Sequence, residues 1–183
     1  MNVMPAQDSL DFEEYQELAQ KTMAKMNSYE LDMSHMTIGM FSEYYELYEA
    51  MYKQDIVNIA EEIADIQWYF AGYCTIRGKE MSSFVVDRPW SFEDKRLSTS
   101  ISELADLVKK NIIYRKDINE QFENKILMQI QYNLDRYINQ FSLKTGNILY
   151  NNIEKLKVRF PNKFSEEKAL NRNLKEERNK LES

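Results

Sequence analysis

The sequences FSEYYELYEA (residues 41–50) and EEIADIQWYF (residues 61–70) share one pattern, in which acidic pairs lie among aromatic and aliphatic residues. Glu43 and Glu46 are three residues apart, and so are Glu62 and Asp65. Residues with this spacing lie on the same face of an α-helix. Because both stretches are apolar nearly all round, they are typical of helices that are buried on several faces. They predict two packed helices that carry acidic pairs into a half-buried groove.

The composition of the whole chain also favours helices. The 183 residues contain only 4 glycines and 3 prolines, whereas an all-β fold needs many tight turns built from these residues. We therefore expect an all-α protein, folded as a helical bundle. The length suits a single domain that spans residues 1–183.

Hydrophobic periodicity and capping residues divide the chain into a series of expected helices. Asp11, with Glu14 three residues later, predicts a capping box for the first helix, which should end near Asn27. The other expected elements are helices over about 33–54, 56–76, 100–114 (opened by Ser100), 117–143 (opened by Asp117) and 147–159, a connector over 79–96 that tucks Phe84, Val85, Val86 and Trp90 against the bundle, and a last polar helix opened by Ser165.

A weak internal repeat relates two of these helix pairs. SELADLVKKN, which begins at Ser102, resembles SEYYELYEAM in the first pair, so residues of about 33–76 and 100–143 are candidate copies. Glu103 and Asp106 correspond to the first acidic pair. The second acidic pair has no acidic counterpart, so the second copy reads as a degenerate structural partner.

Charge and hydropathy exclude two classes of partner. The net charge of −6 and the pI near 5.0 argue against binding to duplex nucleic acid, which requires clustered cationic side chains. No stretch approaches the roughly 18 apolar residues that a membrane span needs. The acidic start of the chain lacks the apolar region of a signal peptide. Since Cys74 is the only cysteine, we expect a reduced thiol and a cytoplasmic protein.

The four acids suggest a metal site if their two helices are antiparallel neighbours. Four converging carboxylates repel one another and need compensation. A hard divalent cation bound by oxygen ligands, most naturally Mg²⁺, supplies it, and the absence of histidine and cysteine ligands argues against zinc or copper. A carboxylate-bound Mg²⁺ indicates chemistry on a phosphate ester or anhydride. Similar acidic pairs also occur on solvated helix faces, so a purely structural interpretation remains open.

The pattern Glu43-x-x-Glu46 followed by Glu62-x-x-Asp65, with EEIADIQWY as its second half, resembles the all-α nucleoside triphosphate pyrophosphohydrolases of the MazG type. The entry segment LDFEEYQELAQKTM and the ending NNIEKLKVRFPNKFSEEKALNRNLKEER are similar to those of phage and bacterial members. Together these segments cover well over half of the chain.

The sequence departs from the family pattern in two ways. Tyr45 and Ala64 stand where the family usually has glycine, which concerns close packing rather than metal ligation. In the second copy, no Glu-x-x-Asp motif follows the first acidic pair. The first copy is therefore the better candidate for the site.

The resemblance implies an all-α bundle that depends on Mg²⁺, with Mn²⁺ as a substitute, and that hydrolyses a nucleoside triphosphate to the monophosphate and pyrophosphate. It also implies assembly as a homodimer or homotetramer. In this interpretation the four acids bind metal and clamp the triphosphate, and one of them, or a water that they orient, positions the attacking water.

The triphosphate also needs cationic side chains, and the basic tail (residues 147–183) offers several. Lys155 and Arg159 lie four residues apart on one expected helix. The full candidate set for substrate binding is Lys155, Arg159, Lys163, Lys168, Asn171 and Arg172, of which Asn171 would contact the sugar or base. An ordinary solvated helix and tail would explain the same residues.

Two further residues have alternative interpretations. Trp68 would stack on a base, although tryptophan at helical spacing is more often a core residue. His35, the single histidine, reads as a cap or packing residue. A non-catalytic nucleotide-sensing or partner-binding module remains the alternative to the enzyme, and the two differ in whether turnover follows Mg²⁺ binding.

Overall fold

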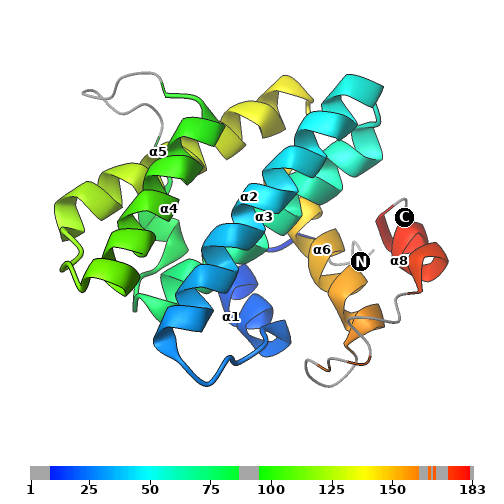
Figure 1. The fold of residues 1–183 in the computed structure, drawn as a ribbon. Helices are drawn as coiled ribbons and strands as arrows, with labels where there is room; N and C mark the ends of the chain where they lie inside the picture. Colours follow the sequence, from blue (N-terminus) through cyan, green and yellow to red (C-terminus); the bar gives the residue numbers. More distant parts are fainter. Residues whose placement is uncertain (1–8, 87–94, 161–164, 166, 168–172, 182–183) are drawn as a thin grey trace, which may run out of the picture.

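The computed structural model describes residues 9–86, 95–160, 165, 167 and 173–181. Within these ranges the chain is helical and contains no β-strand, which confirms the all-α expectation (Figure 1). No described helix is long and apolar enough to cross a membrane. The elements are α1 (Phe12–Thr22), α2 (Tyr29–Lys53), α3 (Ile56–Ile76), the 3₁₀-helix η1 (Met81–Phe84), α4 (Leu97–Tyr114), α5 (Glu120–Gln140), α6 (Thr145–Arg159) and α8 (Leu174–Leu181).

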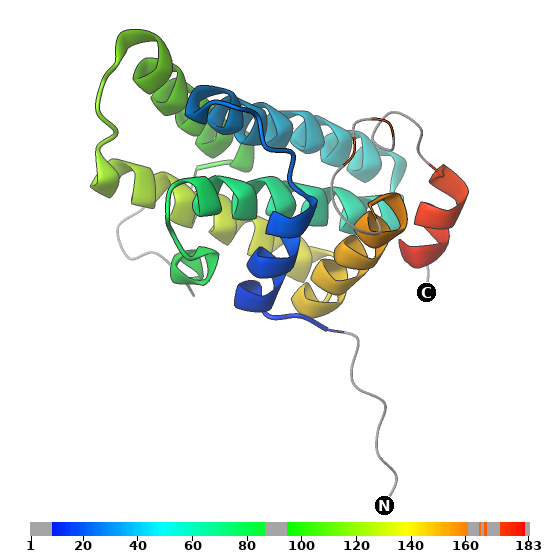
Figure 2. The same ribbon diagram turned by 90° about the horizontal axis from the view of Figure 1, so that it is seen from below.

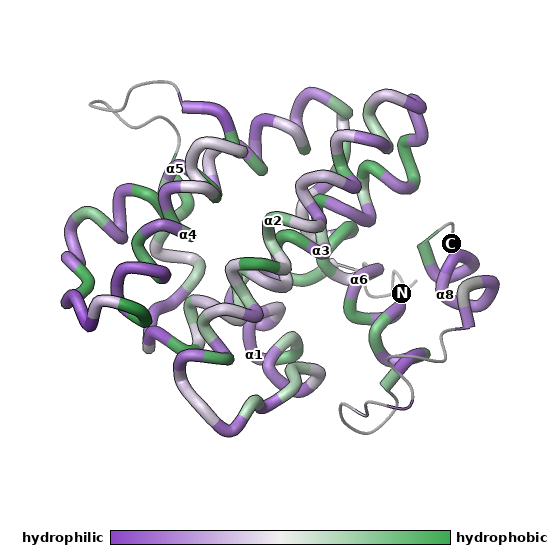
Figure 3. The backbone as a smooth tube through the Cα atoms, viewed as in Figure 1, coloured by the Kyte–Doolittle hydropathy of each residue, from purple (hydrophilic) through white to green (hydrophobic). Residues whose placement is uncertain are grey.

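Helix α3 occupies the centre of the bundle. It contacts α2, α1, α5 and α6, and α2 also packs on α4, which in turn packs on α5 (Figures 1 and 2). Ile59, Ile63, Ile66 and Phe70 of α3 are fully buried. Figure 3 shows hydrophobic and hydrophilic residues interleaved along the helices, as expected for amphipathic segments around one core. The acidic residues of α3 therefore lie near the centre of the bundle and are partly shielded from solvent.

The expected starts of α1 and α3 are confirmed. The Asp11 side chain accepts a hydrogen bond from the backbone N–H of Glu14, whose own side chain accepts from Asp11 N–H, which completes the capping box. Asp55 caps α3, whose bounds match the expected helix. Gln54 adopts a left-handed conformation (φ 56°). It makes the sharp turn that brings α3 back along α2.

Other helix ends differ from the sequence-based expectation. Helix α1 stops at Thr22, and Ser28 caps α2 by accepting from Leu31 N–H, so α2 starts earlier than expected. The prediction for Ser100 is wrong, because α4 begins at Leu97 and the buried Ser100 hydroxyl instead donates to the carbonyl of Arg96. A serine inside a helix commonly makes such a contact with the preceding turn.

The second half of the chain shows similar shifts. Asn119, rather than Asp117, caps α5, which ends at Gln140. Helix α6 begins at Thr145, earlier than expected, and ends at Arg159, as expected. The last helix is described as α8, with the Asn173 side chain accepting from Glu176 N–H. Most of the expected turn after Ser165 lies outside the described residues.

The connector after α3 is only partly as expected. Phe84 is buried, but Val85 is exposed and Val86 half-buried. Trp90 lies outside the described residues. The short 3₁₀-helix η1 buries Met81 as well as Phe84 and so closes the end of the bundle.

A buried glutamate ties the end of α3 to α5. Glu123 receives hydrogen bonds from the Tyr73 hydroxyl (2.7 Å) and the Arg77 Nε (2.7 Å), and Lys79 Nζ lies 3.3 Å away. Burial raises the pKa of Glu123, but the hydrogen bonds from Arg77 and Tyr73 and the nearby cations bring it below its ordinary value. This charged network ties the end of α3 to α5.

Candidate metal and nucleotide site

Three of the four acids that the sequence predicts to converge lie close together. One carboxylate oxygen each from Glu43 of α2 and from Glu62 and Asp65 of α3 lie within 4.8 Å of one another. This happens because α2 and α3 run antiparallel and carry the acids on facing sides. Glu46 lines the same pocket but is outside this group of three.

These oxygens fit a hard cation. Two oxygens bound to the same Mg²⁺ are at most about 4.2 Å apart, since each lies at roughly 2.1 Å from the ion. Separations of up to 4.8 Å are close to that limit. Carboxylates alone are also the ligand type that Mg²⁺ and Mn²⁺ prefer. The residues present therefore suit such an ion.

The electrostatics of the three acids also favour a bound cation. Burial raises the pKa of Glu62, and the charges of Asp65 and Glu43 raise it further. The pKa of Glu43 is raised by burial and then by Asp65 and Glu46. Both carboxylates therefore hold protons more tightly than an exposed glutamate does. A bound cation would offset this repulsion and favour the ionised ligands.

A pocket of about 420 Å³ surrounds the acids. Its acidic lining comes from Glu43 and Glu46 of α2, from Glu61, Glu62 and Asp65 of α3, and from Glu177 of α8. Arg159 at the end of α6 and Arg178 of α8 also line it. One pocket thus holds both the candidate metal ligands and two guanidinium groups suited to anionic oxygens.

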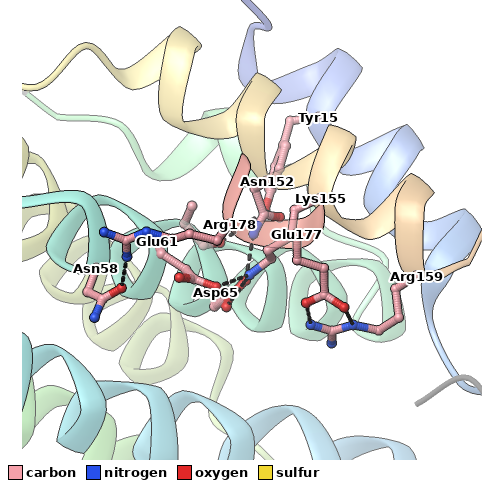
Figure 4. Close-up of polar contacts among 10 residues, drawn as sticks. Tyr15, Asn58, Glu61, Asp65, Asn152, Lys155, Arg159, Glu177 and Arg178 are labelled. Atoms are coloured by element: carbon pink, nitrogen blue, oxygen red, sulfur yellow. Dashed lines mark hydrogen bonds and ion pairs between the residues drawn. The ribbon is translucent and has the colours of Figure 1, made fainter. Parts of the chain in front are cut away.

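The side chain of Lys155 points at Asp65 (Figure 4). Its Nζ is 2.7 Å and 2.5 Å from the two oxygens of Asp65 and 3.2 Å from Glu61 Oε1, and the residue is only 1% exposed. Burial lowers the pKa of Lys155, but the charges of Asp65 and Glu61 outweigh it and raise the pKa above its ordinary value. Lys155 is thus a charged group that holds the Asp65 carboxylate in one orientation.

Asp65 has further support from α6 and α1. Asn152 Nδ2 donates to Asp65 Oδ1 at 2.5 Å. The Tyr15 hydroxyl lies 2.8 Å from Asn152 Oδ1 and 3.1 Å from the carbonyl oxygen of Ala64. Such contacts orient the groups that bind a ligand directly. The chain Tyr15–Asn152–Asp65 therefore links three helices at the site (Figure 4).

The two arginines join α8 to α6 and to α3. Arg159 donates from Nε (3.1 Å) and Nη2 (2.6 Å) to the two carboxylate oxygens of Glu177. Arg178 Nη1 donates to Asn58 Oδ1 at 2.5 Å (Figure 4). These contacts place the last helix along one wall of the pocket.

The candidate substrate-binding residues thus have different outcomes. Arg159 lines the pocket as expected. Lys155 differs from the sequence-based expectation, because a buried ammonium bonded to Asp65 and Glu61 does not face a substrate phosphate, so we assign it a positioning role. The other candidates, Lys163, Lys168, Asn171 and Arg172, lie outside the described residues.

Aromatic rings form another part of the pocket lining. The rings of His35 and Tyr69 are 5.6 Å apart, and those of Trp68 and Tyr69 are 4.9 Å apart, both edge to face. Trp68 is largely buried and donates its indole N–H to Thr22 Oγ1. Burial lowers the pKa of His35, and its buried Nδ1 has no hydrogen-bond partner among the described residues. His35 therefore offers a neutral polar atom in an aromatic setting.

The second copy does not build an equivalent site. Glu103 pairs with Lys95 at 2.5 Å. Asp106 is half exposed and pairs with Lys109 and Lys110. In the described part of the chain, the grouping of acidic side chains that suits a metal is the one built on Glu43, Glu62 and Asp65.

Comparisons with known proteins found no significant match. No protein-family model matches the chain, and neither the curated proteins nor the solved structures contain a significant match. The function is therefore inferred from the chemistry of the pocket and from the acidic motifs.

Proposed function

We propose that this protein is a Mg²⁺-dependent nucleoside triphosphate pyrophosphohydrolase, which cleaves a (deoxy)nucleoside triphosphate to the monophosphate and pyrophosphate. The observation that carries the proposal is the convergence of Glu43, Glu62 and Asp65 within 4.8 Å, in a pocket that also presents arginine and aromatic side chains. The resemblance of the acidic motifs to the MazG type supports it.

The chain's own residues have distinct parts in this reaction. Glu43, Glu46, Glu62 and Asp65 would hold the metal, with Mn²⁺ as a substitute ion, and one of them would orient the attacking water. When bound, the ion supplies Lewis-acid stabilisation of charge that develops on the phosphates. Lys155 and Asn152 keep Asp65 oriented. Such a protein would act in the cytoplasm, on the nucleotide pool.

The substrate would be anchored by groups on two walls. A substrate phosphate would bind Arg159 in preference to water, because guanidinium and phosphate form paired hydrogen bonds. To make that contact, Arg159 must share or release Glu177. The aromatic rings beside His35 offer a surface for the base.

One observation favours the non-catalytic alternative. Asp65 already has a protein cation, Lys155, as its partner, so this carboxylate would be stable without a metal. In a nucleotide-sensing module, the nucleotide would bind but would not be hydrolysed. The two functions therefore differ in a single measurement.

The test is pyrophosphate release by the purified full chain from a panel of ribo- and deoxynucleoside triphosphates, with and without Mg²⁺. We expect Mg²⁺-dependent release that falls more than about 100-fold in the Glu62→Gln, Asp65→Asn double variant, because metal ligation contributes several kcal/mol. Asp106→Asn, at the corresponding acidic pair of the second copy, should retain full activity. Nucleotide binding without release from any member of the panel would replace the enzyme by the sensing module.

His35→Ala should change substrate affinity rather than chemistry. A hydrogen bond between His35 and the base would contribute about 0.5–1.5 kcal/mol, so its loss raises KM roughly 2- to 13-fold. The value of kcat stays unchanged if this bond is equally strong in the substrate complex and in the transition state. Steady-state kinetics on the preferred nucleotide measure this, and circular dichroism checks that the variant is folded. An unchanged KM would show that the base lies away from His35.

A further inference from the structure

The pocket contains one acidic residue that the acidic motifs do not explain. Six acidic side chains line the pocket, and five of them belong to α2 and α3. The sixth is Glu177 of α8, which lies outside the group of three that suits a cation. A further carboxylate is unfavourable in a pocket for a triphosphate, because like charges repel each other. The presence of Glu177 therefore needs a separate explanation.

Glu177 binds Arg159 in the way that a phosphate would. Its two carboxylate oxygens accept hydrogen bonds from Nε (3.1 Å) and Nη2 (2.6 Å) of Arg159, and Glu177 is only 2% exposed (Figure 4). The planar guanidinium group matches carboxylate and phosphate equally, with two parallel hydrogen bonds to either. A phosphate that binds this edge of Arg159 must therefore take the place of the Glu177 carboxylate.

The contacts that hold α8 are of a kind that a ligand can displace. None of the buried hydrophobic residues described lies in α8. Arg178 joins α8 to α3 through Asn58 and through an ion pair with Asp55 at 3.6 Å, in which both side chains are 36% exposed. Exposed ion pairs contribute little to stability, and a polar helix of eight residues is not stable alone. The position of α8 therefore depends largely on polar contacts, among which the pair of Glu177 with Arg159 is well buried.

We propose that Glu177 is an internal competitor for Arg159, which a substrate phosphate displaces and which returns after the products leave. The proposal rests on the proposed function, because its ligand is a nucleoside triphosphate bound with Mg²⁺. Between turnovers the carboxylate compensates the charge of Arg159. During binding it opposes the substrate, so α8 is an autoinhibitory helix that sets how tightly the pocket holds a triphosphate.

Glu177→Gln removes the charge and keeps the hydrogen-bonding position. The glutamine oxygen still accepts from Arg159, and the ring of Phe160, whose centroid lies 5.9 Å from Arg159 Cζ, also supports the guanidinium. A neutral partner is easier to displace than a charged one. The variant should therefore bind Mg²⁺-tripolyphosphate about 5-fold more tightly in titration calorimetry, and KM for the preferred nucleotide should fall by a similar factor.

Glu176→Gln is the matched control. Glu176 is the neighbouring acid on the same helix, but it is exposed and accepts a hydrogen bond from the Asn173 side chain. This variant should leave both the dissociation constant and KM unchanged. If Glu177 only ties α8 to α6, Glu177→Gln will bind tripolyphosphate no more tightly than wild type does, and that result would overturn the proposal.

Amide hydrogen exchange of wild type gives a second readout. Mg²⁺-tripolyphosphate should speed exchange over residues 174–181, because α8 then loses the ion pair that holds it to α6. Slower exchange would mean that α8 closes on the ligand, which contradicts the proposal.

Both readouts follow binding, so they separate this inference from the proposed function. Hydrolysis by a wild type that shows neither change would refute the competitor role of Glu177 alone. Both changes without hydrolysis of any nucleotide would refute the pyrophosphohydrolase alone and support the competitor. Absence of triphosphate binding by wild type and by Glu177→Gln would refute both.

Discussion

Replacing Lys155 with methionine should lower the free energy of unfolding by about 2–4 kcal/mol. Methionine fills similar space but removes the ammonium that lies between Asp65 and Glu61. Loss of one partner from a buried ion pair costs about 3–5 kcal/mol, and the residual exposure of Asp65 and Glu61 (21% and 16%) reduces this. Urea unfolding at neutral pH measures the change.

Two companion variants separate the ion pair from general damage to α6. Lys157→Met lies on the same helix, with an exposed lysine that pairs with Glu154, and should change stability by less than about 0.5 kcal/mol. Adding Asp65→Asn to Lys155→Met should restore part of the loss, because the uncompensated carboxylate is then removed. Equal stability of Lys155→Met and wild type would show that this ion pair does not hold α6 to α3 in solution.

The meeting of the acidic pairs could be predicted because it depends on local rules. A spacing of three residues places Glu62 and Asp65 on one helix face, and the short turn at Gln54 makes α2 and α3 antiparallel neighbours. The caps at Asp11 and Asp55 could also be predicted, but the one at Ser100 could not. Ser100 fits a capping pattern in sequence, yet it lies inside α4, where its hydroxyl contacts the preceding turn.

The support of Asp65 could not be predicted from the sequence in this way. Tyr15 and Asn152 are 137 positions apart, and Asn152 and Asp65 are 87 apart. Their contacts exist only after α1 and α6 pack on α3. Lysine is usually exposed, so nothing in the sequence distinguishes the buried Lys155 from its exposed neighbour Lys157. Tertiary packing decides which of them becomes part of the site.

Glu62→Gln should affect stability and function in opposite directions. Because burial and neighbouring carboxylates raise the pKa of Glu62, the folded state binds its proton more tightly than the unfolded state does. The free energy of unfolding of the metal-free wild type therefore falls as pH rises above the ordinary range of glutamate. Glutamine carries no charge and avoids this loss. With a chelator present, the variant should be about 1–2 kcal/mol more stable than wild type at pH 8, and this difference should shrink towards pH 5.

Mg²⁺ should reverse the order. A ligand that binds only the folded state raises its stability, so Mg²⁺ should increase the melting temperature of wild type, and more at pH 8 than at pH 5, where protons compete for the carboxylates. Glu62→Gln should show little increase and little pyrophosphate release, while Asp106→Asn should behave as wild type in both assays. A metal-free Glu62→Gln protein that is less stable than wild type at pH 8 would mean that the glutamate stabilises the fold. The acidic group would then be structural, whereas a gain in stability with a loss of metal response is the signature of residues retained for binding at the expense of the fold.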